Sequence, residues 1–278
     1  MASLLDYSKF TLARAISATK RTLLGRHVEA VLVRSSCGVF LVDVEDMYVG
    51  RQLAWNGDYC AAELERLLAV LTERDTLLVV GTHIGALAVP ASKHCRSVIA
   101  IEANPRTFRL LRENLLLNEC HNVRALNIAA SDRNEKLQFV ASRVNSGGSK
   151  RMPVIADYAY FYDSPEVLLV EAHPLDEVLG DSPIDVILMD IEGSEYFALG
   201  GMQRILAQAS VLIMEFIPHH LRNVSGVSVD QLLAPIKPHF STMFVPSRGV
   251  TVSNPKFGEV LRTMYDCERQ DDGIVFRK

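Results

Sequence analysis

The stretch Leu77-Leu-Val-Val-Gly-Thr-His-Ile-Gly-Ala-Leu-Ala-Val89 carries an apolar run into Gly81, and a second glycine, Gly85, follows four residues later. A short, wholly apolar run is typical of a strand that is buried on both faces. Glycine after such a strand permits a tight turn and lets a ligand approach the backbone. A helix that follows would offer free N–H groups at its first turn. The stretch therefore predicts a strand, a turn and a helix, with a ligand site at the turn.

The same alternation continues along the rest of the chain. Apolar strand-like runs alternate with segments of helical period, and the expected strands cover residues 77–80, 97–102, 123–129, 185–190, 211–216, 240–245 and 272–278. Strands that are apolar throughout and separated by helices indicate a parallel sheet covered on both faces. We predict an α/β fold over residues 75–278, with a doubly wound, mostly parallel, seven-stranded, Rossmann-like sheet whose last strand can be antiparallel. One helix is expected over 107–118 and another over 195–206.

Residues 1–74 are expected to form an N-terminal extension of one helix and one β-hairpin, followed by a turn at 55–59 and a helix at 60–71. The helix at 3–24 has apolar points at Phe10, Leu12 and Ile16, and lysines and arginines on its other faces. Such a helix either packs on the domain or lies against a membrane or partner. Base rates favour packing on the domain.

Composition excludes several classes of protein. The 278 residues carry a formal net charge of −4, so nothing indicates a nucleic-acid partner. No apolar run is long enough to span a bilayer, and the N-terminus lacks the pattern of a secretory signal. The five cysteines are odd in number, far apart and without a C-x-x-C pair, which argues against disulfides or a zinc site and favours the cytoplasm.

Carboxylates follow several of the predicted strands, where an open parallel sheet binds its ligands. Glu102 lies 21 residues after Gly81 (102 − 81) and can accept hydrogen bonds from a ribose diol, or it can simply precede the next helix. Asp190 and Glu192 follow the fourth strand, and Glu195 belongs to the first turn of the next helix. Glu215 and His219 follow the fifth strand, and a histidine there can accept a proton.

These stretches, in this order, resemble the FkbM-type family of S-adenosylmethionine-dependent methyltransferases. The resemblance rests on VVGTHIG (79–85), VIAIEANPRTFRLLRENLLLN (98–118), NIAASDRNEKLQF (127–139), NSGGS (145–149) and DVILMDIEGSEYFALGGM (185–202). It implies a class I methyltransferase fold, S-adenosylmethionine as cofactor with S-adenosylhomocysteine (SAH) as product, and O-methylation of a hydroxyl on a sugar or a polyketide-like natural product. The acceptor would be a small molecule, with no nucleic acid as partner.

The resemblance also implies roles for individual residues. Gly81 and Gly85 would face the methionine part of the cofactor, Glu102 would bind the ribose, and Asp190 would lie near the sulfonium and the substrate. The remaining cofactor-binding candidates are His83, Ala103, Asn104, Ala130 and Ser131, of which Ala130 and Ser131 would lie near the adenine.

The chain departs from the family pattern at its first strand. The family usually has the motif Asp-Val-Gly-Ala-Asn-x-Gly at this place, and this chain has Val79 in place of the Asp and His83 in place of the Asn. Glu63, Asp190 or a water would then supply the lost acceptor, or the chain has lost methyl transfer and kept the fold. Pro90 should kink the next helix or delay its start.

Methyl transfer to a hydroxyl requires a positioned nucleophile and an acceptor for its proton. Asp190, Glu192 and His219 are the candidates for these catalytic roles, and the segment 141–166 is a candidate lid. Asp190 and Glu215 could ligate Mg²⁺, but without a third ligand in the sequence a metal is not favoured. The rival hypotheses are a binding or scaffold protein on a methyltransferase fold, for which Val79 argues, and a nucleotide-dependent oxidoreductase, against which the absence of G-x-G-x-x-G argues.

Overall fold

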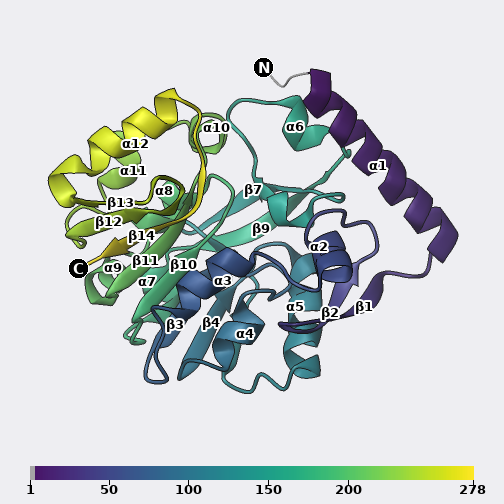
Figure 1. Ribbon diagram of the computed structural model, residues 1–278, viewed down its shortest axis with the longest axis horizontal. Coiled ribbons are helices and arrows are strands. Elements are labelled where there is room, and N and C mark those ends of the chain that lie inside the picture. The colour runs from purple at the N-terminus through teal and green to yellow at the C-terminus, as the bar shows by residue number, and fades with distance from the viewer. Residues whose placement is uncertain (1–3) are drawn as a thin grey trace.

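The computed structural model describes residues 4–278 of the chain, and its main feature is a central sheet between two layers of helices (Figure 1). In this part of the chain the sheet has eight strands, in the order β13 (Val250–Ser253), β12 (Thr242–Val245), β14 (Asp271–Arg277), β11 (Val211–Phe216), β10 (Val186–Met189), β3 (Thr76–Val80), β4 (Ser97–Ile101) and β5 (Val123–Leu126). The five strands from β11 to β5 are parallel, and β14 and β13 run antiparallel to their neighbours. The predicted doubly wound α/β fold is confirmed.

The helices cover the two faces because alternate residues of each strand point to opposite sides. Leu78 and Val80 pack in one core with residues of the later helices, whereas Leu77 and Val79 pack in another with the helices before and after β3. The helices are α1 (Leu4–Leu24), α2 (Val49–Asn56), α3 (Ala61–Leu68), α4 (Ala88–Ser92), α5 (Pro105–Leu117), α6 (Tyr158–Phe161), α7 (Leu175–Leu179), α8 (Glu195–Gly200), α9 (Gln203–Gln208), α10 (Pro218–His220), α11 (Val229–Leu233) and α12 (Phe257–Asp266).

Strand register places the ends of the central strands at one edge. Val80 pairs with Met189 of β10 on one side and with Ile101 of β4 on the other. The residues that directly follow these three strands, Gly81, Asp190 and Glu102, therefore emerge together from the carboxyl edge of the sheet. This edge is where open parallel sheets bind ligands.

A second, smaller sheet covers this edge, and the sequence patterns did not predict it as a sheet. Its strands lie in the order β6 (Ala129–Ala130), β9 (Glu166–His173), β7 (Glu135–Ala141) and β8 (Lys150–Arg151). Short helical turns complete the described chain at η1 (Ser146–Gly148), η2 (Leu221–Ser225), η3 (Pro246–Arg248) and η4 (Asn254–Lys256). The segment 141–166 thus contains β8, η1 and α6 rather than a structureless loop.

The N-terminal elements are a helix and a hairpin, as predicted. The hairpin pairs β1 (Ala30–Ser35) with β2 (Gly38–Asp43), and Phe40 and Val42 of β2 share a core with Leu110 and Leu111 of α5. Helix α1 packs on the rest of the molecule, where the Phe10 ring stacks on Tyr162 with centroids 4.6 Å apart. Residue 3 of the predicted helix lies outside the described residues. No helix among those described is long and apolar enough to cross a bilayer.

Four local predictions were wrong. The strand predicted over 123–129 is two strands in different sheets, β5 and β6, because the chain leaves the central sheet after Leu126. The sheet has eight strands instead of seven because Gly249, at φ +61°, turns the chain so that β13 pairs beside β12. The predicted turn at 55–59 begins two residues too early, since α2 continues to Asn56 and ends at Gly57 in the left-handed conformation. The helix predicted over 195–206 is two helices, α8 and α9, separated at Gly201 and Met202. Helix α4 starts late, at Ala88, as Pro90 predicted.

Candidate functional site

A cavity of about 290 Å³ opens at the carboxyl edge of β3, β4 and β10. The second sheet, α2, α3, η1 and residues of β11 and β14 supply other parts of its walls. Of the residues singled out from the sequence, those that line the cavity are Gly81, His83, Glu102, Ala103, Ala130, Asp190, Glu192, Glu215, Glu63 and Val79. The size and the mixed polarity of this cavity suit a small-molecule ligand.

Gly81 is required where the chain leaves β3. Its φ is +87°, and a Cβ there would collide with the backbone carbonyl of Asp190 at the end of the neighbouring strand. Gly85, at φ +91°, serves packing instead, because a Cβ there would meet Leu111 of α5 and the residue does not line the cavity. The close approach of two strand ends therefore accounts for the glycine that the sequence places after β3.

Glu102 is held rigidly at the end of β4. Its two carboxylate oxygens accept backbone N–H bonds from His83 and Asn104, each 2.8 Å long. Burial raises the pKa of Glu102 to about 7, against the lowering effect of these two bonds. Each oxygen keeps acceptor capacity for a ligand. The carboxylate is thus fixed at the cavity wall, where it can accept hydrogen bonds from a diol.

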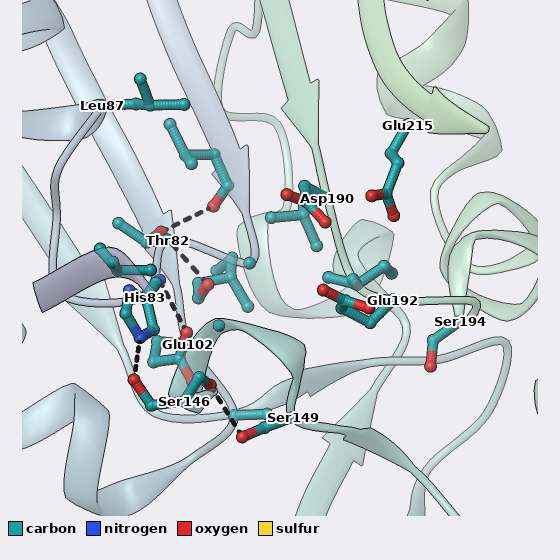
Figure 2. Close-up of a pocket in the computed structure, with 18 of the residues that line it drawn as sticks. Thr82, His83, Leu87, Glu102, Ser146, Ser149, Asp190, Glu192, Ser194 and Glu215 are labelled. Atoms are coloured by element: carbon teal, nitrogen blue, oxygen red, sulfur yellow. Dashed lines mark hydrogen bonds between the residues drawn. The ribbon is translucent and has the colours of Figure 1, made fainter. Parts of the chain in front are cut away.

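His83 connects the glycine turn to the segment that covers the cavity. Its φ is +53°, and its Nε2 lies 2.7 Å from the Ser146 hydroxyl (Figure 2). The Ser146 hydroxyl in turn donates a hydrogen bond to the Asp46 carboxylate. Burial lowers the pKa of His83. Three segments that are far apart in sequence meet here. The sequence marked His83 and the stretch containing Ser146, but nothing in it paired them.

Carboxylates dominate the opposite wall. Asp190 and Glu215 point toward one another in Figure 2, with Glu192 beside them, and Glu63 and Asp272 line the same cavity from α3 and β14. Burial, followed by the charge of Glu192, raises the pKa of Asp190 well above its usual range, although its side chain is reached by solvent through the cavity. Burial and then Asp190 do the same for Glu215. This wall favours a cationic ligand, which would relieve the repulsion between the carboxylates.

Lys150 of β8 supplies the counter-charge at the edge of this wall. Its Nζ lies 3.0 Å from Glu192 Oε2 and 3.1 Å from His220 Nε2, and the Lys150 side chain is only 6% exposed. The Nδ1 atom of His220 is 3.3 Å from the same Glu192 oxygen but forms no hydrogen bond there. Burial and then Lys150 lower the pKa of His220 well below its usual range, so the ring is neutral. Neither Lys150 nor His220 could be placed here from the sequence.

Glu192, Glu215 and His220 lie close enough together to hold a metal ion, with one ligand atom of each within 4.8 Å of the others. The sequence offered only Asp190 and Glu215 as oxygen ligands. Because the Lys150 ammonium already bonds Glu192 and His220, a cation of the protein itself occupies the edge of this group. A divalent ion would have to bind beside that ammonium, which costs free energy.

Four candidates from the sequence do not line the cavity. Asn104 caps α5 by accepting the Arg106 N–H, and the buried Ser131 hydroxyl donates to Glu135. His219 is half-buried with its ring stacked at 6.3 Å from Tyr160, and Gly85 packs on α5 as described. Glu195 is the first residue of α8, and its Oε1 accepts the backbone N–H groups of Ile191 and Gly193, which fixes the loop that carries Glu192.

Comparison with known proteins identifies the family of this chain. A family model described as the methyltransferase FkbM domain matches residues 80–270. A tRNA(Phe) (4-demethylwyosine(37)-C(7)) aminocarboxypropyltransferase from Methanocaldococcus jannaschii is 25% identical over 179 residues, which are 63% of this chain and 68% of the relative.

Two solved structures are also matched. One is the methyltransferase FkbM from Methylobacillus flagellatus KT, at 16% identity and a TM-score of 0.44 over 75% of this chain; this chain spans 44% of that protein. The other is a putative methyltransferase from Streptococcus mutans in complex with SAH, at 12% identity and a TM-score of 0.45, with 78% of this chain and 96% of that one covered. By the match over most of its length, this chain belongs to the FkbM methyltransferase family.

Proposed function

We propose that this protein uses S-adenosylmethionine to methylate a hydroxyl group of a small molecule, a sugar or a polyketide-like natural product. The observation that carries the proposal is the placement of Glu102. Its carboxylate is fixed by two backbone N–H groups at the wall of a cavity that also contains the glycine turn and an acidic wall. When bound, the cofactor would supply a methyl group on a sulfonium centre.

Each lining residue would contact a different part of the cofactor, according to its position in the cavity. Glu102 would accept the two ribose hydroxyls, and Ala130 would lie against the adenine. Gly81 would let the cofactor approach the backbone. Glu63, at the α3 end of the cavity, would accept the ammonium of the amino-acid part, which replaces the acceptor that Val79 does not provide.

Asp190 would hold the acceptor hydroxyl and take its proton. The raised pKa of Asp190 favours its protonated form in the empty cavity, and the positive charge of the bound cofactor would favour the ionised form that can take the proton. Glu192, oriented by Lys150, would bind a second group of the acceptor. His219 does not line the cavity, so Asp190 and not His219 would accept the proton. Positioning of the hydroxyl on the methyl axis would contribute most of the rate.

A small neutral or cationic group suits this end of the cavity better than a phosphate backbone. Six carboxyl side chains line the cavity, those of Glu63, Glu102, Asp190, Glu192, Glu215 and Asp272, against one guanidinium, that of Arg151. Phosphates would be repelled. The name of the Methanocaldococcus relative refers to tRNA, and tRNA is therefore the substrate class to test against. A cytoplasmic location belongs to the same proposal, supported by five cysteines that are all free.

The experiment is an activity screen. The purified protein is incubated with S-adenosylmethionine and either a panel of hydroxylated sugars and polyketides or total tRNA, and SAH release is measured. The proposal predicts SAH release with one class of small molecule and loss of that release in Asp190→Asn. Release with tRNA alone would overturn the acceptor class. The rival hypothesis of a scaffold protein predicts that neither the cofactor nor SAH binds.

A further inference from the structure

A surface groove runs between α1 and α2, outside the cavity described above. Its volume is about 540 Å³, and it is lined by Lys9, Leu12, Ala13, Ile16, Met47, Tyr48, Arg51, Gln52, Trp55 and Asn56, which we call the Trp55 groove. Figure 1 shows α1 along the outside of the molecule, where one flank of the helix faces away from the sheet. The fold leaves this groove open, and the proposed transfer chemistry does not use it.

The groove exposes three large apolar side chains among polar and charged ones. Trp55 is 79% exposed, Leu12 61% and Ile16 42%, and the three belong to one lining. Helix α1 is anchored by residues on another side, since Phe10 stacks on Tyr162 and the Ser17 hydroxyl donates to the Glu45 carbonyl at 2.8 Å. The exposed side chains are therefore not needed to hold the helix. Clustered apolar surface of this kind marks a binding site.

The groove is also positively charged in a protein whose net charge is −4. Lys9 and Arg51 line it, and no carboxylate is among its lining residues in the described chain. Among the side chains that the structure describes, those of residues 8–278, neither cation forms an ion pair, and Arg51 lies over the Trp55 ring, with its Cζ 5.8 Å from the ring centroid. Uncompensated cations beside apolar surface attract a ligand that carries both an anionic group and hydrocarbon.

The groove adjoins the candidate active site. Tyr48 and Gln52 line both the groove and the acidic cavity, so the two share a wall. Their charged side chains differ in sign, since six carboxyl groups line the cavity and two cations, Lys9 and Arg51, line the groove. A ligand that spans the wall would place its anionic end in the groove and its neutral end in the cavity.

We propose that the Trp55 groove binds the remote end of the methyl acceptor, and that this end is an acyl chain that carries an anionic group. The inference rests on the proposed function, because it takes the cavity as the transfer site. Aliphatic side chains of α1 and the face of the Trp55 ring can pack on hydrocarbon, and Lys9 and Arg51 can bind the anionic group. Two cations are too few for a nucleic-acid backbone.

Trp55 makes the test direct because it is the only tryptophan of the chain. Its emission is followed while decanoate or decyl phosphate is added below the concentration at which either forms micelles, with decanol as the uncharged control. We expect a saturable blue shift with the acids and a weaker effect with decanol. The carboxylate and phosphate arms distinguish the two head groups.

A matched pair of charge reversals tests the assignment. Arg51→Glu should weaken decanoate binding tenfold or more, whereas Arg34→Glu, an equal change on the exposed face of β1, should leave it unchanged. Equal effects of the two variants, no shift with either acid, or a shift only with a single-stranded RNA would overturn the inference.

Calorimetry with SAH on the same samples separates the two proposals. If SAH binds and the acids do not, the groove inference fails and the proposed function stands. If the acids bind and SAH does not, the proposed function fails, and the groove does not serve a methyl acceptor. Binding of both ligands to one sample supports the inference.

Discussion

Replacement of Glu63 tests the amino-acid end of the proposed cofactor site separately from its adenosine end. It lies in α3, is 7% exposed, and lines the cavity together with Val79. Glu63→Gln keeps the shape and removes the charge. A hydrogen bond to a charged partner contributes about 1.5–3 kcal/mol, which corresponds to roughly 10- to 150-fold in affinity. The variant should therefore bind SAH about 10- to 150-fold more weakly than the wild type.

The assay compares SAH with 5′-methylthioadenosine by calorimetry. Methylthioadenosine keeps the adenine, the ribose and the sulfur but lacks the amino-acid group, so Glu63→Gln should not change its affinity. Glu65→Gln, in the same helix but exposed, is the control and should change neither. An equal loss for both ligands, or no loss for SAH, would refute the assignment of Glu63 to the ammonium.

The pH dependence should follow from the same carboxyl group. Burial raises the pKa of Glu63 to about 7, so much of it is protonated below that pH in the free protein. An ammonium partner favours the ionised form, and binding must then release a proton. The contribution of Glu63 to SAH affinity should rise as the pH increases through about 7, and Glu63→Gln should remove that part of the rise.

Three further predictions concern stability, measured by urea unfolding. Gly81→Ala should destabilise the protein by more than about 2 kcal/mol because the new Cβ would collide with the Asp190 carbonyl. Gly249→Ala, which has open space at φ +61°, should cost only about 1 kcal/mol. Equal losses of stability in the two variants would contradict this. Lys150→Met should cost about 3–5 kcal/mol, since Glu192 loses its buried partner; an unchanged midpoint would show that the pair is not buried in solution. The pKa of Glu102 is about 7 in the folded protein against 4.5 for a free glutamate, so its contribution to the free energy of unfolding is greatest below pH 4.5 and is lost as the pH rises through 7. Glu102→Gln should therefore flatten the decline of stability with pH, and an identical pH profile in the variant would refute this.

Much of the central sheet could be predicted from the sequence because its strands are apolar on both faces. The runs at 77–80, 186–189 and 211–214 contain no polar residue, and such runs are typical of strands buried between two helical layers. The smaller sheet was missed because its strands lack such all-apolar runs. β9 reads Glu-Val-Leu-Leu-Val-Glu-Ala-His, with exposed and buried positions mixed, because one face of that sheet meets solvent.

The candidate site divides in the same way. Glu102 and Asp190 could be predicted because each follows a strand, and strand ends meet at one edge of a parallel sheet. Lys150 and His220 could not, since they come from a short strand and a three-residue helix that have no periodic pattern. Their meeting with Glu192 depends on how the second sheet lies over the first. His219 was chosen over His220 because sequence alone does not say which of two adjacent side chains turns inward.

Titration of SAH into the wild type and into Glu102→Ala tests whether the cavity is a cofactor site. We predict micromolar binding to the wild type, about −8 kcal/mol, and a sharp loss of affinity in the variant. Absence of heat and of any thermal shift at millimolar SAH would contradict the cofactor site. Equal binding by both proteins would contradict the role of Glu102 as the ribose acceptor.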